Sequence, residues 1–291
     1  MNKPLKLSFK KTGMQTTIQD LGRIGWQEYG VPESGAMDKK SLRLANFLVS
    51  NPEDNPCIEI TIIGPEIHFN QPAVIAVTGA DLSPKVNGKL IPLNEPVPLK
   101  EDDILTFGRC KSGCRAYLAV HGTWQVPPWL ESRSTVPYAG ALAGLPPILN
   151  KGDEVQIHYD RLPDKEFEIQ VLPVHRNRFR VIPGPEFHHF SPESQNALIR
   201  TEYHISGESN RMGYRLEEKL PGALPQNELI SSGTIPGTIQ VTKSGQIILL
   251  MADAQTTGGY PRLAVVVSED LDSLGQKKPG DPIGFKYEIG Q

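Results

Sequence analysis

The chain has 291 residues, and at about 150 residues per domain this length predicts two domains. Its 30 Lys and Arg nearly balance its 33 Asp and Glu, which leaves a net charge of −3. A charge so close to zero argues against a general electrostatic grip on nucleic acid or on an anionic membrane. We therefore expect no nucleic-acid partner and no membrane, and a ligand that is recognised locally.

Cysteine usage and hydropathy point to a reducing compartment. The three cysteines, Cys57, Cys110 and Cys114, are sparse and odd in number, which suits neither a disulfide framework nor a zinc site. The first 15 residues lack the apolar core of a signal peptide, and no stretch approaches the roughly 18 apolar residues of a membrane span. We expect a cytoplasmic protein without a bound metal.

The first half of the chain predicts short strands and one helix. Gly and Pro, at 27 and 26 residues, are spread throughout and separate many short elements. A helix over 39–49 is capped by Asp38, with Leu42, Ala45 and Leu48 on one stripe. Alternating or β-branched runs predict strands at 6–10, 57–63, 73–78, 104–107, 116–120 and 154–157.

The second half repeats this arrangement. Strands are predicted at 179–182, 239–241, 247–251 and 263–267, a helix begins at Ser191 with Pro192 in its first turn, and a short helix spans 268–274. This weak internal repeat in the order of elements predicts a mostly β protein of two barrel-like domains, each plugged by a helix. The polar segment 162–174 marks their junction, so the domains are expected at 1–165 and 166–291.

Familiar catalytic signatures are absent. The glycine-rich segment 108–113 lacks the Lys-Ser/Thr pair of a phosphate-binding loop, because Cys114 and Arg115 follow it. There is no Gly-x-Ser-x-Gly elbow and no His-x-x-x-His spacing, and adjacent His188 and His189 suit a surface loop. Any site must therefore be built from less common segments.

Two polar segments could bind an anion. Segment 31–38 leads into the first helix, where backbone N–H groups attract an anion and Gly35 admits a close approach, although Asp38 could simply cap its own helix. In segment 209–216, an extended backbone would place Arg211, Gly213 and Arg215 on one side. An Arg fork of this kind suits a carboxylate or phosphate, with a solvated Arg stripe as the alternative.

The third segment, 252–262, lies between two strongly apolar strands and is longer than a simple hairpin requires. Its length and its hydrogen-bonding groups favour a binding loop. Segment 233–241, just before it, could bring Gln240 to the same binding site. The candidate side chains in this loop are Asp253, Gln255, Thr256, Thr257, Tyr260 and Arg262.

These segments resemble the allophanate hydrolase subunit 2 or biotin-dependent carboxyltransferase family, which includes the C subunit of 5-oxoprolinase and an antagonist of a sporulation-kinase inhibitor. The matching stretches are TTIQDLGRIGWQEYGVPESGAMD (16–38), IEIT (58–61), TGAD (78–81), SRST (132–135), SNRMGYRL (209–216), PGTIQ (236–240) and ADAQTTGGYP (252–261). They span nearly the whole chain in order. The resemblance implies two cyclophilin-like β-barrel domains with few helices, working with a partner subunit of related fold.

The resemblance implies several chemistries. The chain carries no biotin-carrier sequence, which favours the C subunit of an ATP-dependent 5-oxoprolinase, in a complex with its A subunit and with a B subunit that is allophanate hydrolase subunit 1-like. ATP is then used at the level of the complex. The alternatives are a biotin-dependent carboxyltransferase half-site of the urea type, the only case that requires biotin, and a regulatory protein that antagonises a kinase inhibitor.

Under the oxoprolinase hypothesis the site must hold a substrate carboxylate and stabilise an oxyanion or phosphate. Arg211 and Arg262 are expected to bind the anion. The amide or phosphate is expected to accept or donate hydrogen bonds at Gln240, Gln255, Thr256 and Thr257. Tyr260 supplies packing and a hydroxyl group, and Asp38 and Asp253 are candidate acids or bases.

Overall fold

The structure is a computed structural model, and it describes residues 4–136, 146–163, 176–222, 224–225 and 230–288. Two compact units make up the chain. The first contains Met1–Arg23 and Ser34–Pro173, and the second contains Ile24–Glu33 and Val174–Gln291. The expected domain boundary at 165/166 falls within 164–175, outside the described residues.

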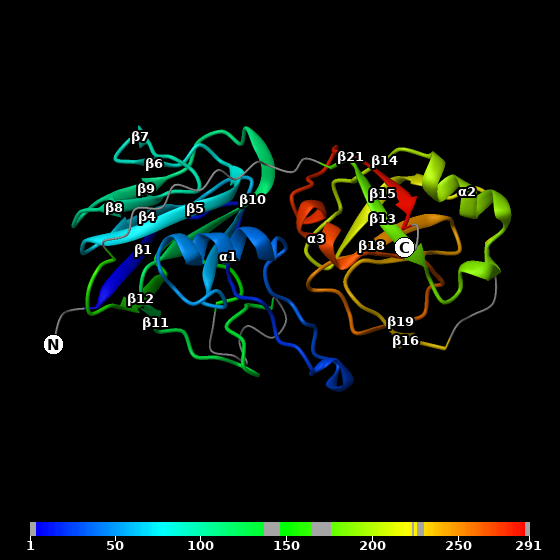
Figure 1. Cartoon of the computed structure of the whole chain (residues 1–291), viewed down its shortest axis with the longest axis horizontal. Coiled ribbons are helices and arrows are strands. Elements are labelled where there is room, and N and C mark those ends of the chain that lie inside the picture. Colours follow the sequence, from blue (N-terminus) through cyan, green and yellow to red (C-terminus); the bar gives the residue numbers. More distant parts are fainter. Residues whose placement is uncertain (1–3, 137–145, 164–175, 223, 226–229, 289–291) are drawn as a thin grey trace. The chain divides into compact units, whose positions relative to one another are not determined.

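The first unit contains two antiparallel sheets (Figure 1). One sheet has the order β11 (Thr123–Trp124), β12 (Glu154–His158), β1 (Leu5–Lys11), β4 (Glu66–Phe69), β9 (Ile104–Thr106), β6 (Lys85–Val86) and β7 (Lys89–Leu90). The other has the order β2 (Gln15–Gln19), β3 (Cys57–Thr61), β10 (Ser112–Val120), β5 (Ala73–Asp81) and β8 (Pro96–Leu99).

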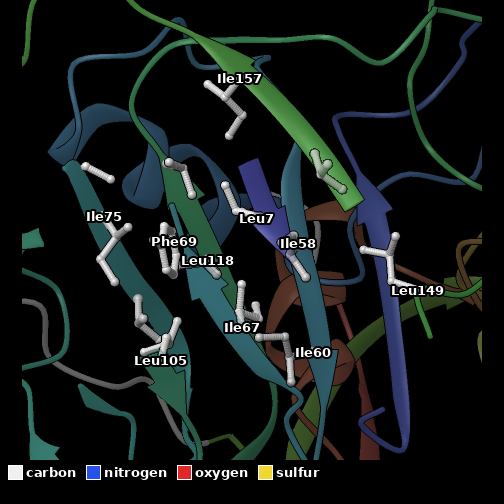
Figure 2. Close-up of a cluster of buried hydrophobic side chains, with 14 of the residues drawn as sticks. Leu7, Ile58, Ile60, Ile67, Phe69, Ile75, Leu105, Leu118, Leu149 and Ile157 are labelled. Atoms are coloured by element: carbon white, nitrogen blue, oxygen red, sulfur yellow. The ribbon is translucent and has the colours of Figure 1, made fainter. Parts of the chain in front are cut away.

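The main core of this unit lies between the two sheets. Leu7 and Phe69 from one sheet and Ile58, Ile60 and Leu118 from the other belong to one buried cluster (Figure 2). In β1 the residues alternate between buried and partly exposed, which is the pattern of a strand with one face on a core. All five residues of β3 are buried, so this strand is covered on both faces.

Helix α1 (Lys39–Leu48) covers the outer face of the five-stranded sheet. Leu42 and Ala45 pack against Tyr117 and Ala119 of β10, whereas Leu118 between them points into the main core. The expectation that a helix plugs this barrel is therefore wrong for the first unit. A nine-residue strand with both faces apolar needs a cover on its second face, and α1 supplies it.

The second unit is built on a barrel-like sheet. Its order is β14 (Tyr203–His204), β21 (Pro282–Tyr287), β13 (Arg178–Pro183), β20 (Arg262–Val266), β17 (Thr238–Val241), β18 (Gln246–Leu250) and β15 (Gly213–Lys219). A β-bridge between Ile205 and Leu216 joins the two end strands, so the sheet nearly closes on itself. A small ladder, β16 (Ser232–Gly233) with β19 (Thr257–Gly258), lies apart from it.

The helices of the second unit begin where the sequence predicts. Helix α2 (Pro192–Arg200) has the side chain of Ser191 as its cap, and α3 (Ser268–Gly275) follows β20. Two short 3-10 helices, η1 (Gln27–Tyr29) and η2 (Phe187–His189), complete the unit. None of the helices in the described part of the chain combines the length and the apolar character that crossing a bilayer requires.

The extended conformation expected over 209–216 is only partly present. Strand β15 starts at Gly213, and the residues before it form a turn in which Asn210 N–H donates to Gly213 O and Met212 N–H donates to Asn210 Oδ1. Arg211 is consequently buried while Arg215 is exposed. The predicted stripe of two Arg side chains on one face is therefore wrong, because the turn breaks the alternation.

Candidate functional site

The candidate site is organised around the loop 252–262, which connects β18 to β20 in the second unit. Its first, middle and last residues are each tied to a different neighbouring segment. Between these ties the side chains of Gln255, Thr257 and Tyr260 are exposed, and Thr256 is half-buried. The loop is therefore a fixed frame that presents polar side chains to the outside.

The first tie is a buried ion pair between Arg211 and Asp253. Arg211 Nε donates to Asp253 Oδ2 at 2.8 Å, and Arg211 Nη2 donates to Oδ1 at 2.9 Å. Backbone contact reinforces the pair, since Asp253 N–H donates to Arg211 O at 2.9 Å. The exposed fraction is 3% for the Arg211 side chain and 0% for Asp253. Both carboxylate oxygens of Asp253 are thus engaged within the protein, and the pair fixes the turn at 209–212 to the start of the loop.

The second tie joins the middle of the loop to segment 232–234. Thr234 N–H donates to Thr256 O at 2.9 Å, and Thr234 Oγ1 donates to Gln255 O at 2.6 Å. The ladder β16–β19 continues this pairing, with Gly233 opposite Thr257. Because the backbone at 255–256 bonds inward, the side chains of Gln255 and Thr257 are left pointing to solvent.

The third tie anchors the end of the loop to Glu186. Arg262 Nε and Nη2 donate to the two carboxylate oxygens of Glu186 at 2.8 and 2.7 Å, and Arg262 Nη1 donates to Gly233 O at 2.8 Å. The guanidinium of Arg262 lowers the pKa of Glu186, outweighing the effect of partial burial. Gly184 allows the segment to pass close by, since a Cβ there would lie 2.2 Å from Arg262 O. Arg262 is therefore held in place by a carboxylate and a carbonyl.

Gln240 is the unusual group beneath this frame. Its side chain is 1% exposed, and neither its Nε2 nor its Oε1 has a hydrogen-bond partner among the described residues. Gly258 lies directly over it, since a Cβ at Gly258 would be 2.5 Å from Gln240 Nε2 and 3.4 Å from a methyl group of Thr234. An unpaired buried amide costs about 1–3 kcal/mol, so its presence calls for an explanation.

Asp38 belongs to the first unit. Its carboxylate accepts hydrogen bonds from Ser41 N–H at 3.0 Å and Ser41 Oγ at 2.6 Å, so it caps α1. Its backbone N–H donates to Tyr117 Oη at 2.8 Å, and that hydroxyl donates to Glu59 at 2.7 Å. Burial and the two nearby carboxylates raise the pKa of Tyr117 well above its usual range. The structure thus shows the capping role of Asp38, within a buried polar cluster.

A second motif of the first unit is held together by Asp20. Its carboxylate accepts hydrogen bonds from Ser132 Oγ and Ser134 Oγ, both at 2.6 Å, and from Gly22 N–H at 2.8 Å. The guanidinium of Arg23 lies over the ring of Trp129, 4.8 Å from its centroid. The stretches 16–38 and 132–135, which carry the family resemblance, therefore meet in one buried hydrogen-bond network.

The structure brings eight of the nine predicted site residues to one loop system, and it adds two that the sequence analysis missed. The eight are Arg211, Gln240, Asp253, Gln255, Thr256, Thr257, Tyr260 and Arg262. The missed residues are Glu186, which pairs with Arg262, and Thr234, which binds the loop backbone. Glu186 follows the sequence Pro-Gly-Pro, whose glycine was a signal for close packing.

Among the residues that the structure describes, no group of three or more His, Cys, Asp or Glu is placed to hold a metal ion. The carboxylates of the loop system, Asp253 and Glu186, are both paired with arginines. The chemistry that this site offers is hydrogen bonding from amide and hydroxyl groups.

Relatives of the chain fall into two groups by their names. It is 39% identical to the 5-oxoprolinase C subunit of Escherichia coli over 280 residues, covering 96% of this chain and 90% of the relative. The corresponding protein of Haemophilus influenzae is 37% identical, covering 94% and 88%. Urea amidolyase of Saccharomyces cerevisiae is 33% identical over 97% of this chain, which spans only 16% of that protein.

Two solved structures are similar to this chain over nearly its whole length. The crystal structure of TTHA0988 has a TM-score of 0.85 and 30% identity, covering 98% of this chain and 56% of its own. The urea amidolyase of K. lactis has a TM-score of 0.86 and 32% identity, covering 98% of this chain and 19% of its own. The chain thus spans about half of the first structure and a fifth of the second.

A protein-family model matches most of the sequence. Residues 29–287, which cover most of both units, match the model described as "Carboxyltransferase domain, subdomain A and B". The mostly β architecture that the resemblance implied is confirmed, as is the resemblance itself. The chain belongs to the carboxyltransferase domain family that comprises subdomains A and B.

Proposed function

We propose that this chain is the C subunit of an ATP-dependent 5-oxoprolinase, which opens the lactam of 5-oxo-L-proline to L-glutamate together with the A and B subunits. The observation that carries the proposal is the similarity to two 5-oxoprolinase C subunits, at 39% and 37% identity over 96% and 94% of this chain. In contrast, the urea amidolyases contain the region of this chain as a fifth or less of their length. The match along nearly the whole of the two oxoprolinase components therefore favours this role over that of a urea amidolyase.

The buried amide of Gln240 supports a lactam as the ligand. A lactam presents a C=O and an N–H on the same edge, and a primary carboxamide offers the complementary donor and acceptor. The Nε2 and Oε1 of Gln240 have no other partner among the described residues, so two parallel hydrogen bonds would satisfy both. In this proposal Gly258 and the short β16–β19 ladder move to admit the substrate.

The surrounding residues take the remaining roles. The exposed amide and hydroxyls of Gln255, Thr256 and Thr257 bind the substrate carboxylate or an added phosphate group, and the ring of Tyr260 packs over the bound molecule. The N–H groups of Arg262 that are not bonded to Glu186 or Gly233 donate to the same anion. Arg211 and Asp253 act as positioning residues through the start of the loop, because each is paired with the other.

The lactam is a stable amide, and phosphorylation of its carbonyl oxygen by ATP in the complex would make the carbonyl carbon reactive toward water; the ring C–N bond would then break and phosphate would leave. This chain's part in the step is to hold the lactam edge and to stabilise negative charge on the oxygen as it develops. Asp38 of the first unit, which caps α1, stays a candidate acid or base.

Reconstitution with the A and B subunits tests the proposal. The complete complex should release glutamate from 5-oxo-L-proline only with ATP, and omission of this chain should abolish release. Thr257→Ala, which removes an exposed hydroxyl without a structural bond among the described residues, should raise KM and leave folding intact. A complete, folded complex that hydrolyses ATP without releasing glutamate would refute the assignment.

A carboxyltransferase half-site of the urea carboxylase type is the second candidate. The structural match to the K. lactis urea amidolyase over 98% of this chain favours it. Biotin would suit the same place, because its ureido ring carries the C=O and N–H edge that the amide of Gln240 complements. Transfer of carboxylate from a loaded biotin carrier to urea, in the absence of 5-oxoproline, would establish this reading over the first.

A further inference from the structure

A basic hollow lies on the second unit, away from the loop 252–262. It has a volume of about 520 Å³ and is lined by Arg176, Asn177, Arg178, Arg180, Asp270 and Lys286. Four of these six side chains are cationic and one is anionic. The volume is within the range of about 300–1,000 Å³ that is usual for small-molecule sites.

The pairing of two strands creates this concentration of charge. Phe179 and Val181 of β13 are fully buried, so Arg178 and Arg180 point away from the core. Strand β21 runs parallel to β13, with Gly284 opposite Arg178 and Lys286 opposite Arg180. Like charges opposite each other on neighbouring strands are unfavourable, so nearby carboxylates or a bound anion must offset the charges of Arg180 and Lys286.

Asp270 of α3 orders two of the guanidinium groups. Its carboxylate is 0% exposed and accepts hydrogen bonds from Arg176 Nη1 at 2.7 Å and from Arg180 Nη2 at 2.8 Å. Arg180 has further acidic neighbours, Glu288 at 3.3 Å and Glu269 at 4.0 Å. Arg178 and Lys286 have no carboxylate partner in the described part of the chain, so both line the hollow without an ion pair.

The hollow and the loop 252–262 lie at opposite ends of the same strands. Strand β20 is antiparallel to β13, with Val266 opposite Val181 and Ala264 opposite Pro183. The loop enters β20 at Arg262, beyond the Pro183 end of β13, whereas the hollow surrounds the Arg178 end. A ligand in the hollow is therefore separate from one bound at the loop.

We propose that the basic hollow binds a small molecule bearing two or more phosphate groups. The guanidinium fork of Arg178 offers paired N–H donors to phosphate oxygens, and Lys286 adds a point charge next to it. Asp270 holds Arg176 and Arg180 in place before the ligand arrives, which reduces the entropy lost on binding. This inference is independent of the proposed function, because it concerns other residues.

Calorimetric titration of the isolated full chain with tripolyphosphate, ATP and inorganic phosphate, at about 150 mM salt, tests the proposal. We expect tripolyphosphate to bind and phosphate to bind much more weakly. Equal affinity for tripolyphosphate and ATP would show that the phosphate chain is the recognised part, and tighter binding of ATP would add a nucleoside contact. Arg178→Ala with Lys286→Ala should weaken binding roughly tenfold or more, since two charged contacts are lost.

A double variant with the same charge change serves as the control. Arg200→Ala with Lys219→Ala removes two exposed cations of the second unit from places outside the hollow, and it should leave affinity nearly unchanged. Absence of tripolyphosphate binding at the same salt concentration, or equal weakening by both double variants, would overturn the proposal. Glutamate release is not part of this test, so its outcome is separate from that of the proposed function.

Discussion

Arg211 and Gln240 are both nearly fully buried, yet the two side chains stand in opposite situations. Arg211 meets Asp253 with two hydrogen bonds of 2.8 and 2.9 Å. Gln240 meets no polar partner among the described residues. A paired charge holds structure together, whereas an unpaired amide is costly to the free protein and available to a ligand. At the scale of single residues, stability and binding are therefore divided between different side chains.

Removal of Arg211 should strongly destabilise the second unit. Arg211→Ala would leave the carboxylate of Asp253 buried without a counter-charge, a change that costs about 3–5 kcal/mol. Arg215→Ala is the matched control, because that side chain is 49% exposed and its pair with Glu208 spans 3.8 Å; we expect a loss below about 1 kcal/mol. Urea unfolding monitored by circular dichroism measures both, and similar losses would contradict the structural role of the pair.

Replacement of Gln240 should separate stability from activity. Gln240→Met removes the unpaired amide at similar volume, so the free energy of unfolding should stay equal or rise by about 1–2 kcal/mol. Glutamate release by the reconstituted complex should fall sharply. Gln246→Met, in contrast, removes an amide that donates to Leu216 O, and it should lower stability by about 1 kcal/mol. A destabilised, fully active Gln240→Met variant would contradict our reading of this side chain.

The closing seam of the barrel in the second unit is the element whose stability depends most directly on pH. Besides the bridge between Ile205 and Leu216, Ser206 N–H donates to Arg215 O at 2.8 Å. His204 adds two contacts of 2.7 Å with Glu218, one through its backbone N–H and one through Nδ1. Since His204 lies on β14 and Glu218 on β15, this pair joins the two end strands of the sheet.

Stability at the seam should decrease as pH rises above neutrality. The hydrogen bond to Glu218 raises the pKa of His204 above its ordinary 6.5. Burial acts to raise the pKa of Glu218, but its bonds with His204 outweigh this, and its pKa lies below the ordinary 4.5. The His204 contribution is fully present below pH 6.5 and is lost as pH rises through the raised pKa. The Glu218 contribution is present above pH 4.5 and is lost on acidification.

Amide hydrogen exchange at Ser206, whose N–H donates to Arg215 O across the seam, measures this dependence. Protection, corrected for the intrinsic pH dependence of exchange, should be greatest between about pH 4.5 and 6.5 and should fall as pH rises through the raised pKa of His204. His204→Gln, which cannot become charged, should remove the decrease while the seam remains closed. Equal protection of the wild-type seam on the acidic and the alkaline side of neutrality would show that the ion pair does not stabilise it.

The whole chain contains two compact units whose polar networks have separate anchors. In the first unit Asp20 gathers Ser132, Ser134 and Gly22, and a large apolar core lies between two sheets. In the second, Arg211 and Asp253 hold the loop 252–262 to a barrel-like sheet. Each unit thus has the apolar and polar interactions that a cooperative folding unit needs.

The unfolding of the chain in scanning calorimetry should therefore show more than one cooperative transition. We expect Asp20→Ala to lower the midpoint of one transition, because it leaves two buried hydroxyls without their acceptor. Arg211→Ala should lower the midpoint of the other. A single transition that both variants shift equally would show that the units unfold together despite their separate networks.

Patterns within short stretches of the chain were enough to predict the β architecture and most element positions. Hydrophobic alternation located β1, a continuous apolar run located β18, and the caps at Asp38 and Ser191 located α1 and α2. These signals are local, since they depend on the spacing of residues within one element. The polar, glycine-containing composition of 252–262 also indicated the candidate loop before any contact was known.

The pairing of polar groups, in contrast, became known from the folded chain. Arg211 and Asp253 are separated by 42 residues, and Arg262 and Glu186 by 76, so no spacing rule could have matched them. The turn before β15 likewise reversed the expected orientation of Arg211. The physical reason is that a side chain's partners depend on the strand register and burial of distant segments, whereas its local conformation depends on its neighbours in sequence.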